Sequence, residues 1–117
     1  MHNKDTGFLG ENMTALYLIE KGYTILTRNW RYRHLEIDII ASFANRLHIV
    51  EVKTRSTLEF GFPEQMINAK KMQFLKNAAA HYQYQNPHWQ WIQFDIAAVY
   101  KCAEGQWKLD YFEDVYF

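Results

Sequence analysis

The sequence has little cysteine, no excess of charge and no long apolar run, and each shortage excludes a class of protein. One cysteine among 117 residues excludes an internal disulfide framework and a zinc site built from several cysteines. The longest apolar run, residues 96–100, falls far short of the roughly 18 residues that a membrane-spanning helix needs. The first residues lack the apolar stretch of a signal peptide. We therefore expect a cytoplasmic protein with no membrane segment.

Proline is also scarce, and nothing along the chain marks a domain boundary. There are 2 prolines, no internal repeat and no low-complexity tract. Hydrophobic residues make up 49% of the chain, and 8 Phe, 8 Tyr and 4 Trp supply the bulk of a core, which excludes general disorder. A length of 117 residues suits one domain, so we expect residues 1–117 to form a single unit.

The balance of 13 basic and 13 acidic residues conceals an uneven distribution. Residues 28–93 carry nine Lys or Arg and five Asp or Glu, whereas residues 94–117 carry two and five. The basic excess in the middle of the chain permits a phosphate-bearing partner without requiring one.

Hydrophobic spacing predicts the order α-β-β-β-α-β-β, an α/β domain with a mixed sheet flanked by helices. The first helix is expected over residues 7–21, with Gly22 ending it, and the second from Pro63 to about Tyr84. The strands are expected at residues 23–30, 35–43, 46–54, 91–100 and 106–112.

Charged residues interrupt two strands that otherwise look buried. The third strand is flanked by apolar residues on both faces, so we expect it at the centre of the sheet. Residues two apart in a strand share a face. This rule groups Leu47, Ile49, Glu51 and Lys53 on the third strand; on the second strand it groups Glu36, Asp38 and Ile40, with Ile37 and Ile39 opposite. A buried charge needs a partner, because leaving it unpaired costs several kcal/mol.

The turn between these strands determines which charges face each other. A two-residue turn at Ala44 and Asn45 places Asp38 directly opposite Glu51. The Cβ atoms of opposed residues lie about 4.5–5.5 Å apart, so two carboxylates there repel unless a cation lies between them. Carboxylate oxygens suit Mg²⁺ or Mn²⁺, and Lys53 points to the same side. The pattern predicts a divalent metal site beside an ammonium group.

A third carboxylate lies on the first predicted helix. Glu11 is three residues after Phe8, four before Ala15 and seven before Leu18, so it borders an apolar stripe. It either completes an acidic pocket with the hairpin residues or reaches past the stripe to water. The alternative for all these charges is a structural cluster on a solvated face of the sheet.

The order of motifs resembles a known family. Asp38 followed by Glu51-Val52-Lys53 resembles the signature of PD-(D/E)XK nucleases, which have the restriction-endonuclease-like fold. A wider set resembles the YraN family of small bacterial endonuclease-like proteins and covers nearly the whole chain: Gly10-Glu11, Leu18, Gly22-Tyr23, Asn29-Trp30-Arg31, Glu36-Ile37-Asp38, Val50-Glu51-Val52-Lys53-Thr54-Arg55, Phe60-Gly61-Phe62-Pro63, Lys71 and Phe94-Asp95. The arrangement is also similar to archaeal Holliday-junction resolvases, in which the first helix adds a Glu.

The resemblance implies a metal-dependent phosphodiesterase that cuts nucleic acid, with branched or flapped DNA as the favoured form. Asp38 and Glu51 would bind Mg²⁺ or Mn²⁺, with the backbone carbonyl of Val52 as a further ligand. Lys53 would orient or activate the attacking water. Glu11 would bind a second metal ion or act through water.

Basic and aromatic side chains supply candidate contacts to such a substrate. Arg31, Arg55 and Lys71 are the preferred phosphate contacts, with Arg28, Arg33 and Lys70 as further candidates. Four aromatic residues either stack on bases, pack in the core or form a subunit contact: Trp30, Tyr32, Trp89 and Trp91. A domain of this size offers little surface for gripping duplex DNA, which makes a homodimer a reasonable expectation.

Two observations keep a different function open. The net charge is zero, and Leu35 stands where the YraN family usually has a glycine that permits a bulge. Both favour a non-catalytic module that keeps the fold and binds nucleic acid or recruits a partner. A scaffold whose acidic cluster is only structural is a third possibility. Joint retention of Glu11, Asp38, Glu51 and Lys53 favours the nuclease, because a non-catalytic module does not need that set.

Overall fold

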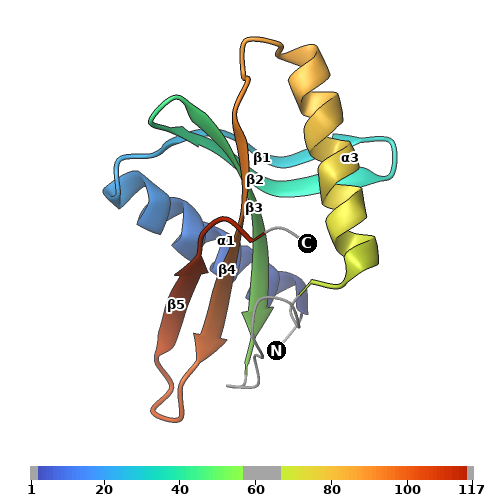
Figure 1. Ribbon diagram of the computed structural model, residues 1–117. Coiled ribbons are helices and arrows are strands. Elements are labelled where there is room, and N and C mark those ends of the chain that lie inside the picture. Colours follow the sequence, from blue (N-terminus) through green and yellow to red (C-terminus); the bar gives the residue numbers. More distant parts are fainter. Residues whose placement is uncertain (1–2, 57–66, 116–117) are drawn as a thin grey trace.

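The computed structural model describes residues 3–56 and 67–115, and the elements in this part of the chain follow the predicted order (Figure 1). The helices are α1 (Asn3–Glu20) and α3 (Ala69–Gln85), and the strands are β1 (Thr24–Tyr32), β2 (Leu35–Phe43), β3 (Arg46–Arg55), β4 (Ile92–Lys101) and β5 (Trp107–Phe112). The second helix was expected to begin at Pro63, which lies outside the described residues; this start is wrong for α3, which begins only at Ala69, because Asn68 is extended. Asn68 caps α3, because its side chain accepts a hydrogen bond from the backbone N–H of Lys71 at 2.8 Å.

The five strands form one mixed sheet in the order β1-β2-β3-β4-β5, which confirms that β3 is central. The pairing of β3 with β4 is parallel, and the other three pairings are antiparallel. A parallel pair needs a long crossover, and α3 lies in that connection. In the described part of the chain, no helix is long and apolar enough to span a membrane.

The helices cover opposite faces of the sheet. Met72, Leu75 and Ala79 of α3 share a core cluster with Leu47 and Ile49 of β3. On the other face, Ala15 and Leu18 of α1 pack with Val50 and Ala97. The predicted division of β3 into two faces is therefore confirmed, and the side chain of Glu51 belongs to the α3 face.

The β2–β3 hairpin has the predicted turn and register. Ala44 and Asn45 have φ angles of 52° and 62°, the left-handed pair that a tight two-residue turn requires. The paired positions run from Phe43 with Arg46 to Ile39 with Val50. The pairing ends there, so the predicted pair of Asp38 and Glu51 is not part of the ladder, although the two carboxylates are close enough for Glu51 to raise the pKa of Asp38.

One predicted face assignment is wrong. Strict alternation places Ile37 and Ile40 on opposite faces, but both lie in the cluster that packs against α3. The alternation slips beside Asp38, where the regular pairing of β2 with β3 ends. Asn29, at the corresponding place in β1, has a φ of 54°. The sheet is therefore irregular at the point where its acidic residues gather, and an irregular strand does not keep a period of two.

Two glycines determine where helix α1 ends and how closely it packs on the sheet. At its end Gly22 has a φ of 95°, and the N–H groups of Gly22 and Tyr23 donate to the carbonyls of Ile19 and Leu18. Gly10 lies against Thr54 of β3 so closely that an added Cβ would overlap the threonine side chain. The predicted stripe along this helix is only partly buried, because Phe8 is 63% exposed while Ala15 and Leu18 are buried.

We expect Gly10→Ala to destabilise the protein by about 1–3 kcal/mol, because either α1 or β3 must shift to make room for the methyl group. Gly7→Ala is the matched control: a Cβ there meets no atom within 4 Å, and alanine favours the helix by about 1 kcal/mol. Thermal unfolding should therefore show a lower Tm for Gly10→Ala and an equal or higher Tm for Gly7→Ala. Equal Tm values for the two variants would contradict the close packing of α1 on β3.

Candidate active site

The site begins where β2 and β3 separate. Beyond the pair Ile39 and Val50, the carboxylate of Asp38 replaces the backbone partner that β3 would otherwise have: its Oδ2 accepts a hydrogen bond from the N–H of Val52 at 2.8 Å. The N–H and C=O of one strand residue face the same neighbouring strand. The Val52 carbonyl therefore also faces the gap beside Asp38.

Glu51 is buried beneath two lysines. It is 5% exposed, and its Oε2 lies 3.7 Å from the Nζ of Lys53 and 3.5 Å from the Nζ of Lys71. Lys53 comes from the same strand, two residues on, whereas Lys71 reaches the site from the first turn of α3. The buried charge of Glu51 therefore has two positively charged partners, and one of them, Lys71, comes from a distant part of the chain.

The pKa of Asp38 is raised to about 7, mainly by burial and next by the negative charge of Glu51. The hydrogen bond from Val52 and the charge of Lys71 act in the opposite direction and do not cancel the effect. In the absence of a cation, Asp38 therefore takes up its proton around neutral pH, instead of at about pH 4 as a free carboxyl does. This is the electrostatic state expected of two carboxylates placed together to share a positive ion.

Glu11 is held beside the same gap by residues of β1. Its Oε1 accepts hydrogen bonds from the Nε of Arg28 at 2.8 Å and from the Nδ2 of Asn29 at 2.9 Å. Arg28 also donates to the side chain of Asn12 at 2.7 Å, which fixes the guanidinium between helix and strand. Glu11 is 8% exposed, so it does not extend past the apolar stripe into water.

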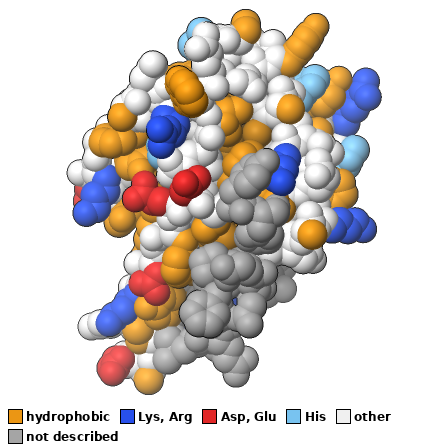
Figure 2. All heavy atoms as spheres, viewed as in Figure 1, with side chains coloured by type: hydrophobic (Ala, Val, Ile, Leu, Met, Phe, Trp, Pro, Cys, Tyr) orange, Lys and Arg blue, Asp and Glu red, His pale blue; other side chains and the backbone are white. Residues whose placement is uncertain are grey.

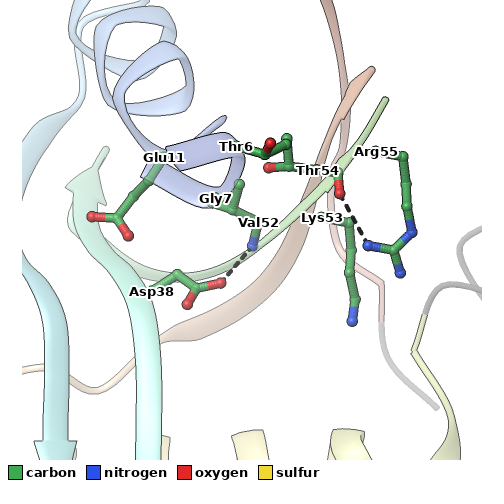
Figure 3. A pocket seen from close by; sticks show the side chains of 8 residues that line it. All are labelled: Thr6, Gly7, Glu11, Asp38, Val52, Lys53, Thr54 and Arg55. Atoms are coloured by element: carbon green, nitrogen blue, oxygen red, sulfur yellow. Dashed lines mark hydrogen bonds between the residues drawn. The ribbon is translucent and has the colours of Figure 1, made fainter. Parts of the chain in front are cut away.

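A pocket of about 490 Å³ joins these elements (Figure 3). Its walls come from the start of α1, from Asp38 and from the end of β3: Thr6, Gly7, Glu11, Asp38, Val52, Lys53, Thr54 and Arg55. Figure 3 shows Glu11 and Asp38 on one side of the pocket and Lys53 and Arg55 on the other. Glu51 does not line this pocket. It lies on the α3 face of the sheet, beside Lys53, which does line the pocket.

The donor set fits a hard divalent cation that keeps several waters. Among the described side chains, those of residues 6–56 and 67–115, no three His, Cys, Asp or Glu come close enough to bind a metal ion by themselves. Two carboxylates and the Val52 carbonyl are nevertheless oxygen ligands of the kind that Mg²⁺ accepts, since it usually takes one or two protein carboxylates and completes its shell with water and phosphate. Glu11 already binds Arg28 and Asn29, which favours action through water over direct ligation.

The three residues predicted to contact nucleic acid occupy different places. Arg55 lines the pocket, and its Nη1 donates to the Thr54 carbonyl at 3.0 Å. Lys71 lies inside the charged cluster beside Glu51. Arg31 is on β1, outside the residues that line the pocket, and pairs with Glu36 at 3.3 Å on the surface. Leu35 pairs with Tyr32 and packs against the α3 core, so this strand needs no glycine there.

A buried polar network centred on β4, the strand next to β3, was not predicted. Asp95 of β4 is 1% exposed. Its carboxylate accepts hydrogen bonds from the hydroxyl of Tyr111 at 2.6 Å, and from the side chain of Gln93 and the backbone N–H of Asp114, both at 2.9 Å. Its Oδ2 also lies 2.8 Å from the Nδ1 of His48. Burial alone would raise the pKa of Asp95, but these hydrogen bonds together hold it below its usual value. The signal was an aspartate within an apolar strand, and the network joins β3, β4, β5 and the segment after β5.

Comparison with known proteins agrees with this architecture. The family described as "Uncharacterised protein family UPF0102" matches residues 10–99, a range that includes every site residue described above except those at the start of α1. A UPF0102 protein of Flavobacterium psychrophilum is 44% identical over 116 residues, which cover 99% of this chain and 96% of the relative. UPF0102 proteins of Christiangramia forsetii and Flavobacterium johnsoniae are 40% and 38% identical, with the same coverage. The chain therefore belongs to the UPF0102 family, the YraN-like family that its motifs resemble.

Proposed function

We propose that this protein is a nuclease that uses Mg²⁺ or Mn²⁺ to cut phosphodiester bonds in DNA. The observation that supports the proposal is the meeting of Asp38 and Glu51 at a break in the sheet, next to two lysines. Asparagine at position 38 would accept the same hydrogen bond from Val52 without the repulsion from Glu51. A purely structural role therefore does not explain an aspartate there, whereas a cation-binding role does.

Each group has a defined task in this proposal. Asp38, Glu51 and the carbonyl of Val52 would hold the ion, which would polarise a phosphoryl oxygen and make a water molecule more acidic. Lys53, directed into the pocket, would orient the attacking water and meet the negative charge that develops on the phosphate. Arg28 positions Glu11 at the border of the pocket, where the carboxylate can accept a hydrogen bond from water. Arg55 would contact a neighbouring phosphate.

The test is cleavage of a panel of labelled DNA molecules by the intact protein. The panel comprises single-stranded, duplex, flapped and four-way branched DNA, each with Mn²⁺, with Mg²⁺ or with EDTA. We expect metal-dependent cleavage of at least one branched or flapped form, and a loss of about 100-fold or more in Glu51→Gln. Cleavage that survives in Glu51→Gln or in EDTA would come from a contaminating enzyme and would contradict the proposal.

The alternative is a non-catalytic module that binds nucleic acid. One observation favours this alternative: two lysines already neutralise the charge of Glu51 without any metal ion. Metal-independent DNA binding with no cleavage of any form in the panel would support this alternative. The expected homodimer also stays a prediction, which the molecular mass in solution would decide.

A further inference from the structure

A row of flat side chains lies on the outer side of the molecule, between α3 and the turn that joins β1 to β2. Phe74, His81 and Tyr84 fall on one stripe of α3, because spacings of seven and three residues return to the same side of a helix. Tyr32 at the end of β1 contacts His81, His34 of the turn contacts Phe74, and Arg33 between them lies over the ring of Tyr32. We call these six residues the stacking surface.

The members of the stacking surface lie against one another. The ring of Tyr32 stacks on His81 with centroids 3.5 Å apart and planes 24° apart, and the guanidinium of Arg33 lies 5.1 Å from the centroid of the same ring. Tyr84 continues the row at 6.4 Å from His81, and His34 contacts Phe74 edge-on at 5.8 Å. Arg33 has a φ of 57°, an unusual conformation for a residue other than glycine in such a turn.

This surface is not part of the core. Tyr84 is 76% exposed and Phe74 is 38% exposed, whereas Trp30 and Tyr82 lie beneath them against the buried cluster. The predicted alternatives for the aromatic residues thus divide: Trp30 and Trp89 pack on the core, and Tyr32 belongs to the exposed row. Flat groups that end in an exposed tyrosine offer a free face to another ring.

The charge around the row is positive. Helix α3 carries no acidic residue, Lys70 and Lys71 lie within one turn of Phe74, and Arg33 adds a charge in the turn, whereas Arg31 on β1 is paired with Glu36. On the side of the molecule that carries α3 and the turn, Figure 2 shows basic and histidine side chains beside hydrophobic ones, and the acidic side chains visible in that view lie elsewhere. This combination of rings and cations is complementary to bases and phosphates.

The row is continuous with the candidate site. Lys71, next to Glu51, is thirteen residues before Tyr84 on the same helix. At 1.5 Å per residue this separation is about 20 Å, which a few nucleotides of an extended strand can span. Bases inside a duplex are already stacked on each other, so the row fits a strand whose bases are unpaired.

We propose that the stacking surface binds an unpaired strand of the DNA substrate, with a base on Tyr84 and phosphates near Arg33, Lys70 and Lys71. This inference rests on the proposed function and specifies its substrate class: DNA with a single-stranded flap or arm next to the cut. The unpaired arm would follow α3 away from Glu51.

The test is binding, measured apart from cleavage. Fluorescence anisotropy with a labelled 15-nucleotide oligo-dT and with a labelled duplex, both in EDTA, reports affinity for the intact protein without any cutting. We expect Tyr84→Ala to weaken oligo-dT binding about tenfold, because one base–aromatic stack is lost, while duplex binding changes less than twofold. Tyr84→Phe keeps the ring and should bind like the wild type. Leu16→Ala, which removes an exposed side chain on the other face of the sheet, is the second control.

Two results would overturn this inference: wild-type affinity of Tyr84→Ala for oligo-dT, or an equal loss for oligo-dT and duplex. Failure of the nuclease proposal gives a different result, because selective binding of oligo-dT through Tyr84 would persist while no DNA in the cleavage panel is cut. Thermal melts of Tyr84→Ala verify that the exposed substitution leaves the fold intact.

Discussion

Replacing Lys53 with methionine is expected to lower the single-turnover rate of DNA cleavage by about two orders of magnitude, the loss typical when one preorganised charge-stabilising donor is removed. Methionine keeps much of the length of the lysine stem and removes the ammonium group. Lys53 lines the pocket across from Asp38 (Figure 3), and its ammonium lies 3.7 Å from Glu51. The measurement is the rate at saturating protein with Mn²⁺, so that a change in DNA affinity does not affect it.

The same substitution should leave the protein folded. Glu51 has two ammonium groups near its Oε2, and Lys71 at 3.5 Å remains when Lys53 is removed. A buried carboxylate that lost every partner would cost several kcal/mol, but here one partner stays. We therefore expect a small fall in Tm for Lys53→Met and a large one only for the double variant with Lys71→Met.

Lys71→Met is the matched control, because it removes the other ammonium group from the same carboxylate. The Lys71 side chain is 39% exposed, compared with 22% for Lys53, and it does not line the pocket. It should weaken DNA binding and its salt dependence more than the saturated rate. A folded Lys53→Met protein that cuts as fast as the wild type would remove Lys53 from the mechanism.

The fold and the acidic pair could be predicted from the sequence because they depend on short-range patterns. Alternation along β3 and a two-residue turn at Ala44 and Asn45 determine which side chains share a face and which lie opposite each other. The observed register confirms the turn and the pairing from Phe43 with Arg46 to Ile39 with Val50, and it ends just before Asp38 and Glu51. The same reasoning failed at Ile37, since a period of two assumes a regular strand.

The partners of the acidic residues could not be predicted, because they come from distant parts of the chain. Lys71 reaches Glu51 from α3, and Arg28 reaches Glu11 across 17 positions of sequence. No local spacing encodes such contacts; they depend on how α1 and α3 are placed on the sheet. Only the resemblance to the YraN family singled out Lys71, and it assigned that residue to nucleic acid and not to Glu51.

The stacking surface also could not be predicted from the sequence, because it joins distant parts of the chain. The sequence shows Phe74, His81 and Tyr84 at helical spacing, but it does not show that Tyr32 and Arg33 lie against them. A turn and a helix separated by more than thirty residues meet there, so aromatic residues in the core and on the surface could not be told apart beforehand.

Without metal ions, Asp38→Asn is expected to make the protein more stable at neutral pH, with a Tm about 5 °C or more above that of the wild type. Asparagine can still accept the hydrogen bond from Val52 and no longer places a second negative charge beside Glu51. Because folding raises the pKa of Asp38 from 3.8 to about 7, the stability linked to its proton is fully present below pH 3.8 and is lost as the pH rises to about 7. The advantage of the variant should therefore grow across this interval and become constant above it.

Asp95 has the opposite dependence, and the comparison with Asp38→Asn must allow for it. The pKa of Asp95 is held below its usual value, so its contribution to stability is present above that value and is lost as the pH falls through the lowered pKa. Both proteins retain Asp95 and should lose stability together in acid. The difference in Tm between wild type and Asp38→Asn, followed in EDTA from pH 4 to pH 8, isolates Asp38.

Adding Mn²⁺ should reverse the order of stability at pH 8. A cation that binds only the folded protein raises its stability in proportion to the logarithm of the metal concentration, and it also removes the repulsion between Asp38 and Glu51. The wild type should therefore gain more in Tm than Asp38→Asn, whose amide oxygen is a weaker ligand without charge. Equal gains in the two proteins would show that the ion binds elsewhere. A less stable Asp38→Asn in EDTA would show that Asp38 is ionised and stabilising, and its pairing with Glu51 would then need no metal ion.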